Sequence, residues 1–534
     1  MKAPLRTASA LLAALLAAGC AGQGPPDAAT MRFDLAADPA NLDPLFLHQD
    51  AASVEQQVAR LAFEPFVDLD GKGRPVPALL AVIPTRANGG VSADGRTIVY
   101  RLRPGVKWSD GVPVGAEDVL YTLHAILDPK NPVRSHEGYD LIDDAKARDA
   151  HTVVFHLKHA WAPAVMTYFS YGFSPQFVLP AHVLRAQEPL ATAAFNAAPT
   201  VGDGPFTFVW WHRGEGLRYV ANPAYWRGKP RIAALDLRIV PDPQTNLVML
   251  ESGAIDWNLI APVQKANLAG NAQIAYANTP TSVVAGVVMN TAHPPFDDVR
   301  VRRAIAMSID RPTISAKITR GAYPVTDVLQ PQFSWAYDPT VKQPGYDPAG
   351  ADRLLDAAGW KRGADGIRHD GAKRLTLVYV QFPETTTGVR VAAYIQAELR
   401  QRGFDASIKS ISNQQLFLPK TGTLATGAFD LAYVPFTMGA DPDDSSILSC
   451  GGASNYMRWC DPQVDALERR AIAATSLSER KALYGRIGRI VADQVPVLYL
   501  FNAYYLYAYR TRVRGFAPNA FLPTWNASAW SLHE

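Results

Sequence analysis

The spacing of apolar side chains changes repeatedly along the chain, and each change predicts a new strand or helix. Residues 97–103 alternate apolar and polar side chains, which predicts a strand with one buried face. Residues 117–127 repeat apolar side chains at helical spacing. Asp347 and Pro348 begin another predicted helix as N-cap and first-turn proline, and Gly359 would end it. Strands and helices mixed in this way indicate an α/β protein.

A helix is also predicted over residues 299–309, because their apolar side chains share one helical face. Asp297 and Asp298 stand at its positive end, where we expect them to cap it. Arg302 and Arg303 lie away from the apolar face. We therefore expect both guanidinium groups to face water.

The most regular alternation of elements lies in the later part of the chain. A strand over 375–380, a helix over 389–402, and strands over 404–411 and 429–436 follow one another. Strand, helix and strand in this order imply parallel pairing with right-handed crossovers. The first half of the chain is richer in Trp, Pro and short strands. We therefore expect a mixed α+β lobe beside a more regular α/β lobe.

Two apolar extended segments, 283–290 and 495–501, either cross between the two lobes or are ordinary core strands. If they cross, the second lobe is an insertion in the first, and the molecule is a hinged clamshell. On that interpretation the first lobe covers residues 31–285, the second covers 286–495, and residues 496–534 return to the first.

The start of the chain has the pattern of an export signal. A positively charged beginning and a short apolar run are followed by Ala-Ala-Gly-Cys at 17–20. So short a run indicates a cleaved signal rather than a membrane-spanning helix. The cysteine after small residues predicts a lipoprotein, with residues 1–19 removed, Cys20 lipidated and residues 20–30 as a flexible tether. An ordinary secretory signal with an incidental Cys20 is the alternative, and in both cases the protein works outside the cytoplasm, in the periplasm or cell envelope.

Composition excludes several classes of function. The 534 residues are 48% hydrophobic and 19% charged, with a formal net charge of +3. A nearly neutral chain of this kind argues against nucleic acid as a partner. After the signal, no stretch of the sequence approaches the roughly 20 apolar residues of a transmembrane helix. The mature chain of about 515 residues exceeds one hydrophobic core, so two or three domains are expected.

Neither cysteines nor catalytic motifs point to an enzyme. Apart from Cys20 the chain has only Cys450 and Cys460. In an oxidising compartment we expect these two to form a disulfide, since no histidine lies nearby to complete a metal site. The sequence holds no phosphate-binding P-loop and no His-Glu-x-x-His. We therefore expect no catalytic residues, no metal and no cofactor.

Five motifs, in order along the chain, resemble one known family. Residues 38–44 (DPANLDP) look like the opening of that family, and residues 92–119 (SADGRTIVYRLRPGVKWSDGVPVGAEDV) are the most specific block. Residues 201–206, 222–226 and 295–302 also fit. The family is that of the extracytoplasmic solute-binding proteins of peptide/nickel-type ABC importers, known as extracellular solute-binding protein family 5. The resemblance covers nearly the whole mature chain.

This resemblance implies a two-lobed, type II periplasmic-binding-protein clamshell of α/β class. The larger lobe would carry an extra α+β subdomain over about residues 50–190. The ligand would be enclosed between the lobes and then delivered to the permease subunits of an ABC transporter. We expect a monomer, held to a membrane through the lipid at Cys20, whose other partner is a peptide or a similar small solute.

Residues 449–460 are similar to dipeptide-binding members of the family, in which the two cysteines pair. Those members hold the amino group of the peptide with an aspartate and its carboxylate with an arginine. This chain has Met438 and Phe382 at those positions; a shifted gap brings Asp441 to the aspartate position, and Arg390 is the nearest arginine. If both charges are missing, a free dipeptide loses two charge-assisted hydrogen bonds, each worth about 1.5–3 kcal/mol.

The candidate ligand-binding residues come from two loops and from these shifted positions. They are His48, Gln49, Asp50, Phe382, Arg390, Phe436, Thr437, Met438 and Asp441. The favoured function is a lipid-anchored receptor that captures di- or oligopeptides for import. Binding of haem, a metal chelate or an oligosaccharide is the alternative. An exported hydrolase or chaperone on the same scaffold is a remote one, because no nucleophile and base set is visible.

Overall fold

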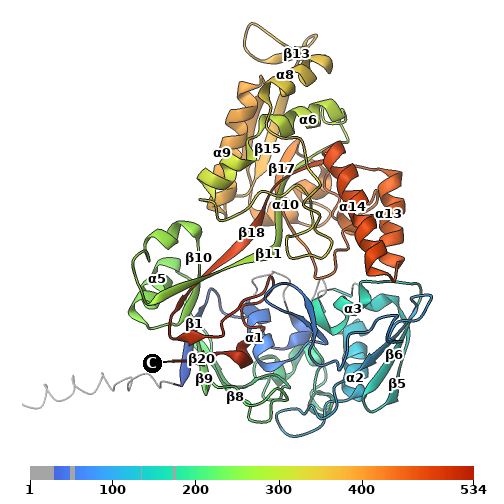
Figure 1. The fold of residues 1–534 in the computed structure, drawn as a ribbon, viewed down its shortest axis with the longest axis vertical. Coiled ribbons are helices and arrows are strands. Elements are labelled where there is room, and N and C mark those ends of the chain that lie inside the picture. Colours follow the sequence, from blue (N-terminus) through green and yellow to red (C-terminus); the bar gives the residue numbers. More distant parts are fainter. Residues whose placement is uncertain (1–28, 48–53, 134, 137, 172–175, 534) are drawn as a thin grey trace, which may run out of the picture.

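The computed structural model describes residues 29–47, 54–133, 135–136, 138–171 and 176–533. In this part of the chain two lobes are stacked along the longest axis of the molecule and are joined by two long strands (Figure 1). The lower lobe contains the beginning and the end of the described chain, and the upper lobe contains the later middle part. The predicted two-lobed clamshell is confirmed.

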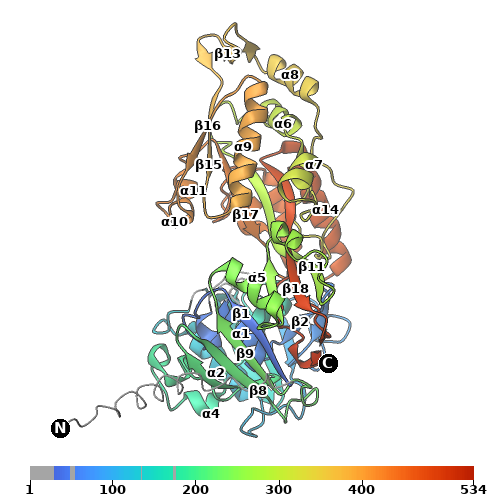
Figure 2. The same ribbon diagram turned by 90° about the vertical axis from the view of Figure 1, so that its left-hand side faces the viewer.

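One ten-stranded sheet runs through both lobes, in the order β16-β15-β17-β11-β18-β10-β1-β9-β8-β7. Its strands are β1 (Thr30–Leu35), β7 (Phe206–His212), β8 (Gly216–Ala221), β9 (Ala234–Ile239), β10 (Trp257–Ile260), β11 (Ile274–Met289), β15 (Thr376–Gln381), β16 (Asp405–Ser410), β17 (Leu431–Thr437) and β18 (Val497–Arg510). Strands β11 and β18 are antiparallel partners and extend from one lobe into the other (Figure 2). The apolar segments 283–290 and 495–501, for which crossing and ordinary core strands were the two alternatives, overlap these strands that run between the lobes.

Helices cover the sheet in both lobes. The longer ones are α1 (Val54–Ala62), α2 (Ala116–Leu127), α5 (Pro243–Ser252), α6 (Val299–Ser308), α8 (Pro348–Ala357), α9 (Thr386–Gln401), α13 (Pro462–Ala473) and α14 (Leu477–Gln494). The predicted helices over 117–127, 299–309 and 389–402 are confirmed as α2, α6 and α9, and β15 pairs in parallel with β16 and β17 as expected. Within the described residues, none of the helices is long and apolar enough for a membrane span.

Each lobe has a hydrophobic core of its own. The lower core draws on residues 31–257 and 507–532 and on Ala440, and the upper core draws on residues 284–501. In the lower core the ring of Phe33 stacks on Trp257 at 4.6 Å between centroids, and meets the edge of Trp530 at 6.4 Å. Because Trp530 comes from the C-terminal segment, the lower core is complete only after the chain has returned from the upper lobe.

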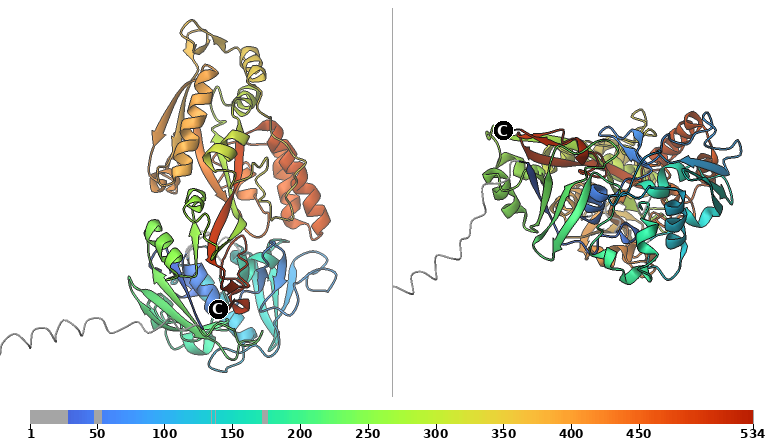
Figure 3. Two further views of the ribbon diagram at one scale, coloured as in Figure 1. Left: turned by 60° about the vertical axis from the view of Figure 1, so that its left-hand side comes forward. Right: turned by 90° about the horizontal axis from the view of Figure 1, so that it is seen from below.

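The lower lobe carries a second, smaller sheet. Its antiparallel order is β4-β6-β5, with β4 at Thr97–Arg101, β5 at Ile142–Asp149 and β6 at Thr152–Leu157. Seen from below, this small sheet and the edge of the main sheet lie on opposite sides of the lobe (Figure 3). The small sheet and α2 thus form the extra α+β part of the larger lobe.

Arg302 corrects one prediction about α6. Its side chain is buried rather than exposed to water. The guanidinium donates hydrogen bonds of 2.9, 3.0 and 2.9 Å to the carbonyl oxygens of Phe296, Asp297 and Gln494. Gln494 is the last residue of α14, and the carbonyl groups at a helix C-terminus lack partners within the helix. Tertiary packing places the Arg302 guanidinium against this negative end, although the helical pattern of α6 predicted that it would face water.

Candidate functional site

The carboxyl ends of β15 and β17 form the edge of the upper lobe that faces the lower lobe (Figure 2). Thr437, the last residue of β17, pairs with Val283, which lies on the part of β11 that enters the upper lobe. In open α/β sheets ligands bind at the carboxyl ends of parallel strands, because the loops there separate and leave a crevice. Phe382 follows β15, and Met438 follows β17, so the structure brings these two predicted site residues to the same edge.

Aromatic side chains gather at this edge. The ring of Phe382 lies 5.8 Å from Tyr433 and 6.2 Å from Phe417, and Phe417 lies 6.2 Å from Tyr456. Phe382 is buried, whereas Phe417 and Tyr456 are half-buried. The position where dipeptide-binding proteins were expected to carry an arginine thus belongs to an aromatic cluster that can stack on planar or apolar groups.

The other predicted site residues differ in burial and in side-chain contacts. Phe436 is buried in the upper core, and Thr437 is exposed. Arg390 is exposed on α9, the helix that follows Phe382, and no other described residue forms a hydrogen bond or ion pair with its side chain. The candidates at 48–50, and the lipidation candidate Cys20, lie outside the described residues.

The segment after β17 crosses from the upper lobe to the lower one. The backbone N–H of Met438 donates to the carbonyl of Ser282 on β11 at 2.9 Å. The backbone N–H of Ala440 donates to the carbonyl of Tyr171 at 3.4 Å, and Tyr171 belongs to the lower core. Residues 438–441 therefore join the two lobes directly.

The side chain of Asp441 is buried and paired with another residue of the protein. Its Oδ2 accepts a hydrogen bond from Nη1 of Arg480 at 2.7 Å, and its Oδ1 accepts one from Nη2 at 2.5 Å. The two residues are only 8% and 6% exposed. Burial alone would lower the pKa of Arg480, but Asp441 raises it above its ordinary value. The carboxylate that we expected to anchor a ligand amine is thus used by Arg480, which also donates to the carbonyl of Ala471 at 2.9 Å.

A buried pair of carboxyl groups follows closely in the chain. Asp444 and Glu468 are 3% and 1% exposed, and Nε2 of Gln330 donates to Oδ2 of Asp444 at 2.9 Å. No donor from another described residue reaches either oxygen of Glu468. Burial raises the pKa of Asp444 to about 6 and raises that of Glu468 well above its ordinary value, and the neighbouring Asp444 adds to the rise for Glu468.

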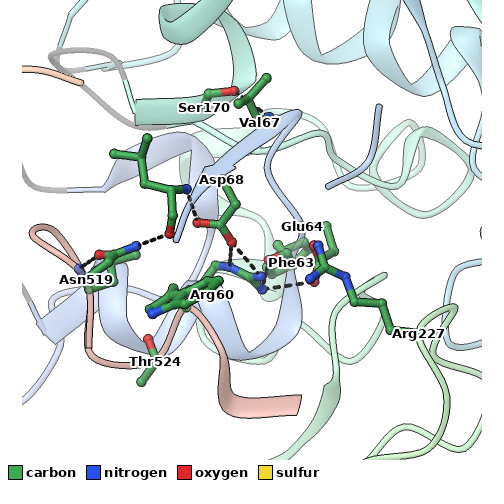
Figure 4. Close-up of polar contacts among 12 residues, drawn as sticks. Arg60, Phe63, Glu64, Val67, Asp68, Ser170, Arg227, Asn519 and Thr524 are labelled. Carbon is green, nitrogen blue, oxygen red and sulfur yellow. Dashed lines mark hydrogen bonds and ion pairs between the residues drawn. The ribbon is translucent and has the colours of Figure 1, made fainter. Parts of the chain in front are cut away.

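A buried network of Arg60, Glu64 and Asp68 lies on the lower-lobe side (Figure 4). The hydroxyl of Tyr171 donates to Oδ1 of Asp68 at 2.7 Å. Arg60 donates to Oδ2 of Asp68 from Nη2 at 2.9 Å and to Oε1 of Glu64 from Nη1 at 3.0 Å. Burial would lower the pKa of Arg60, but Glu64 and Asp68 raise it well above its ordinary value. This network positions the residue whose carbonyl meets Ala440.

A disulfide joins Cys450 and Cys460 and closes the loop that carries Tyr456. The backbone N–H of Cys450 also donates to Oδ1 of Asp465, on α13, at 2.8 Å. The disulfide and this hydrogen bond therefore both hold the loop in place beside the aromatic cluster. In the part of the chain that the structure describes, no group of three or more His, Cys, Asp or Glu side chains is arranged to hold a metal ion.

Sequence reasoning missed three residues that shape this site: Tyr171, Phe417 and Arg480. Tyr171 and Arg480 come from segments far from β17 along the chain, whereas Phe417 ends the short helix Asn413–Phe417 before β17, and no motif marks any of the three. Tyr456 did carry a signal, because it lies in the stretch 449–460 that is similar to dipeptide-binding proteins.

Comparisons with known proteins agree with this architecture. Residues 75–457 match the family described as "Bacterial extracellular solute-binding proteins, family 5 Middle". The chain is 31% identical over 474 residues to "Di/tripeptide-binding protein 2" of Pseudomonas aeruginosa (strain UCBPP-PA14), covering 82% of this chain and 85% of the relative. It is 26% identical over 466 residues to "Heme-binding protein A" of Haemophilus influenzae, covering 81% and 80%. The ABC transporter substrate-binding protein CtaP of Listeria monocytogenes shares the fold, with a TM-score of 0.82, 21% identity and coverage of 95% and 99%.

Proposed function

The chain belongs to the bacterial extracellular solute-binding proteins of family 5, and we propose that it captures di- or oligopeptides for import by an ABC transporter. Members of this family bind a small solute outside the cytoplasm and pass it to a permease. The observation that supports peptide capture most is the carboxyl edge of β15 and β17, which faces the lower lobe across a two-strand connection. Closure about β11 and β18 would enclose a solute there, because contacts to both lobes favour the closed state.

The nature of the site favours peptides that are held by their backbone and apolar side chains. The aromatic cluster of Phe382, Phe417 and Tyr456 would receive side chains, and the exposed Thr437 would meet the peptide backbone. Asp441 would shape the loop through Arg480 instead of binding an amine. We therefore expect tolerance of blocked peptide termini, with Arg390 and residues 48–50 as the remaining polar candidates.

We further propose that the protein is a monomeric lipoprotein without catalytic activity. Residues 1–19 would be removed, Cys20 would carry the lipid, and residues 20–30 would be the tether. The first lobe would cover residues 31–285 and 496–534 and the second would cover 286–495, in agreement with the two separate cores.

A thermal-shift screen with peptides of increasing length, each with free and with blocked ends, tests the proposal. A peptide at about 100 times its Kd stabilises the folded protein by about 2.7 kcal/mol, so a true ligand raises the Tm by several degrees. We expect acetylated and amidated peptides to match their free counterparts. If no peptide raises the Tm, the proposal of peptide capture is wrong. If only dipeptides with free ends raise it, the protein binds the charged termini through side chains that are not among the described residues.

Haem is the second candidate ligand. It is planar and aromatic, which suits the aromatic cluster, and a relative with 26% identity carries the name of a haem-binding protein. Mass spectrometry of the ligand retained through purification, together with the haem absorption band, separates the two candidates. A retained peptide without a haem band supports the first, and a haem band that persists through gel filtration supports the second.

A further inference from the structure

A basic groove lies on the lower lobe, beside the first described residue. Its volume is about 780 Å³. Ala29 and residues 531–533 line it together, so the beginning and the end of the described chain meet there. The strands β19 (Val513–Arg514) and β20 (Ser531–Leu532) pair next to β1 on the lower lobe (Figure 1). The groove therefore lies outside the carboxyl edge where the solute is proposed to bind.

Four arginines line this groove. They are Arg231, Arg510, Arg512 and Arg514. Three of them come from one short segment at the end of β18, and Arg231 comes from the loop before β9. The whole chain has a formal net charge of only +3, so four guanidinium groups in one groove are a strong local concentration of positive charge.

Internal contacts orient two of the four arginines. Arg512 donates to both oxygens of Asp256, from Nε at 2.7 Å and from Nη2 at 3.0 Å. Arg510 donates to Oε1 of Gln273 at 2.7 Å and to the carbonyl of Glu251 at 3.1 Å. Asp256 neutralises one charge, while the partners of Arg510 are uncharged amide groups.

Arg231 and Arg514 have no such partners. Both are exposed, and neither side chain forms a hydrogen bond or ion pair with another residue in the described ranges. Each guanidinium thus keeps its full set of donors for an external anion. Guanidinium groups bind phosphate oxygens through paired hydrogen bonds, which makes a phosphate group the best match for this groove.

The position of the groove indicates where that phosphate comes from. Cys20 stands nine residues before Ala29, which is itself part of the lining. An extended chain spans about 3.3–3.6 Å per residue, so a lipid at Cys20 would hold the groove within about 30 Å of the bilayer surface. A free anion would compete for the groove, but at this distance the membrane surface always presents headgroup phosphates to it.

We propose that this groove docks the lower lobe onto the anionic phospholipid headgroups of the membrane that carries the anchor. The inference rests on the lipid attachment proposed at Cys20, which brings the groove to the membrane. Docking through the lower lobe leaves the upper lobe free to move about β11 and β18. The membrane thus sets the orientation in which the protein opens and closes.

Vesicle flotation of the full chain tests this docking. Cys20→Ser removes the lipid, so binding then reports the protein surface. We expect stronger binding to phosphatidylcholine vesicles that contain roughly 30 mol % phosphatidylglycerol than to phosphatidylcholine alone, and weaker binding as salt is raised. The double substitution Arg231→Gln and Arg514→Gln should lower the anionic component about tenfold.

Two exposed arginines of the upper lobe provide the matched control. Arg469→Gln with Arg486→Gln changes the net charge equally, and neither side chain has a partner among the described residues. This control should bind anionic vesicles as the parent does. Equal losses in the two double variants, or no preference for anionic vesicles, would overturn the proposal.

Two further measurements distinguish membrane docking from the binding of a free anion and from unfolding. If inorganic phosphate raises the Tm and vesicles do not compete, the groove is a free-anion site and membrane docking is wrong. Unchanged far-UV circular dichroism in each variant shows that the loss of binding is not unfolding. The mass of the secreted wild-type protein shows whether Cys20 is lipidated, independently of the vesicle result.

Discussion

Each lobe holds a buried arginine beside the segment that joins the lobes, yet the two lobes build these arginine networks from different parts of the chain. Arg60 in the lower lobe binds Glu64 and Asp68, four and eight residues away. Arg480 in the upper lobe binds Asp441, 39 residues away. The lower wall of the site is therefore a local structure centred on α1 and the strand after it. The upper wall depends on the docking of α14 against the loop after β17.

The balance of charge also differs between these regions. Arg60 faces two carboxylates, and the tyrosine hydroxyls of Tyr171 and Tyr225 donate to them as well. In the upper lobe burial raises the pKa of both Asp444 and Glu468, and no cation among the described residues pairs with either. The lower lobe also holds a carboxyl group of this kind, because burial and the nearby Glu64 raise the pKa of Asp203 well above its ordinary value. A buried carboxyl group with a raised pKa loses stability as its proton leaves. The two walls therefore differ in their cation: Arg60 pairs with carboxylates of the lower wall, whereas no described cation pairs with Asp444 or Glu468.

Removal of the lower arginine should have the largest effect. Arg60→Met leaves two buried carboxylates without their cation, which costs about 3–5 kcal/mol of unfolding free energy. Urea unfolding followed by circular dichroism measures this loss. Arg74→Met, at an exposed ion pair with Asp70, should leave the midpoint almost unchanged. A similar small change in both variants would show that the Arg60 network does not stabilise the lower lobe.

The corresponding change in the upper lobe should be smaller. Arg480→Met leaves one buried carboxylate unpaired rather than two, so we expect a loss of about 3 kcal/mol. Adding Asp441→Asn should recover part of this stability, because no buried charge is then left alone. Solute affinity should fall in the single variant, since residues 438–441 lose their support. Full affinity in Arg480→Met would contradict a positioning role for the pair.

Stability should also fall as the pH rises through the weakly acidic range. Burial raises the pKa of Asp34 and Asp43 to about 7 and that of Asp444 to about 6, all from 3.8. A raised carboxyl pKa means that the folded state binds more protons, so its stabilisation is complete below 3.8 and is lost as the pH passes 6 to 7. We expect the unfolding free energy to decrease by several kcal/mol between pH 5 and pH 8.

Two amide substitutions assign this pH dependence to the lobes. Asp43→Asn keeps the cap of the short helix Pro44–Phe46 and should remove part of the lower-lobe contribution. Glu468→Gln supplies a permanent donor to Asp444 and should reduce the upper-lobe contribution. Thermal unfolding from pH 5 to pH 8 measures both. An unchanged pH profile in Glu468→Gln would mean that the carboxyl pair does not hold a proton.

The smallest expected effect concerns the aromatic cluster. Phe417→Leu keeps an apolar side chain but removes the ring beside Phe382 and Tyr456, so affinity for the solute should fall about fivefold, or about 1 kcal/mol. Leu418→Ala, at the exposed neighbouring residue, should bind as the parent does. Calorimetric titration of both variants checks this. Equal affinities would place the ligand away from the aromatic cluster.

Much of the fold could be predicted because helices and strands depend on local spacing. The alternation in β4, the helical face of α2 and the cap of α8 are each readable over a few residues. The site was less predictable. Phe382 and Met438 do meet at one edge, because both follow parallel strands of one α/β unit. Asp441 was expected to be available to a ligand, since nothing near it in the sequence indicates a buried cation.

The amino-acid sequence by itself determined the secondary structure, the α/β unit, the export signal pattern and the resemblance to a family. Only the tertiary structure decided which charged side chains are paired inside the protein and are therefore not available to a ligand. Arg302 meets the end of α14, Asp441 meets Arg480, and Tyr171 meets Ala440, each across a long stretch of chain. Local spacing acts within a few residues, whereas the partner of a buried charge is chosen by packing, because desolvation excludes every arrangement that leaves the charge alone.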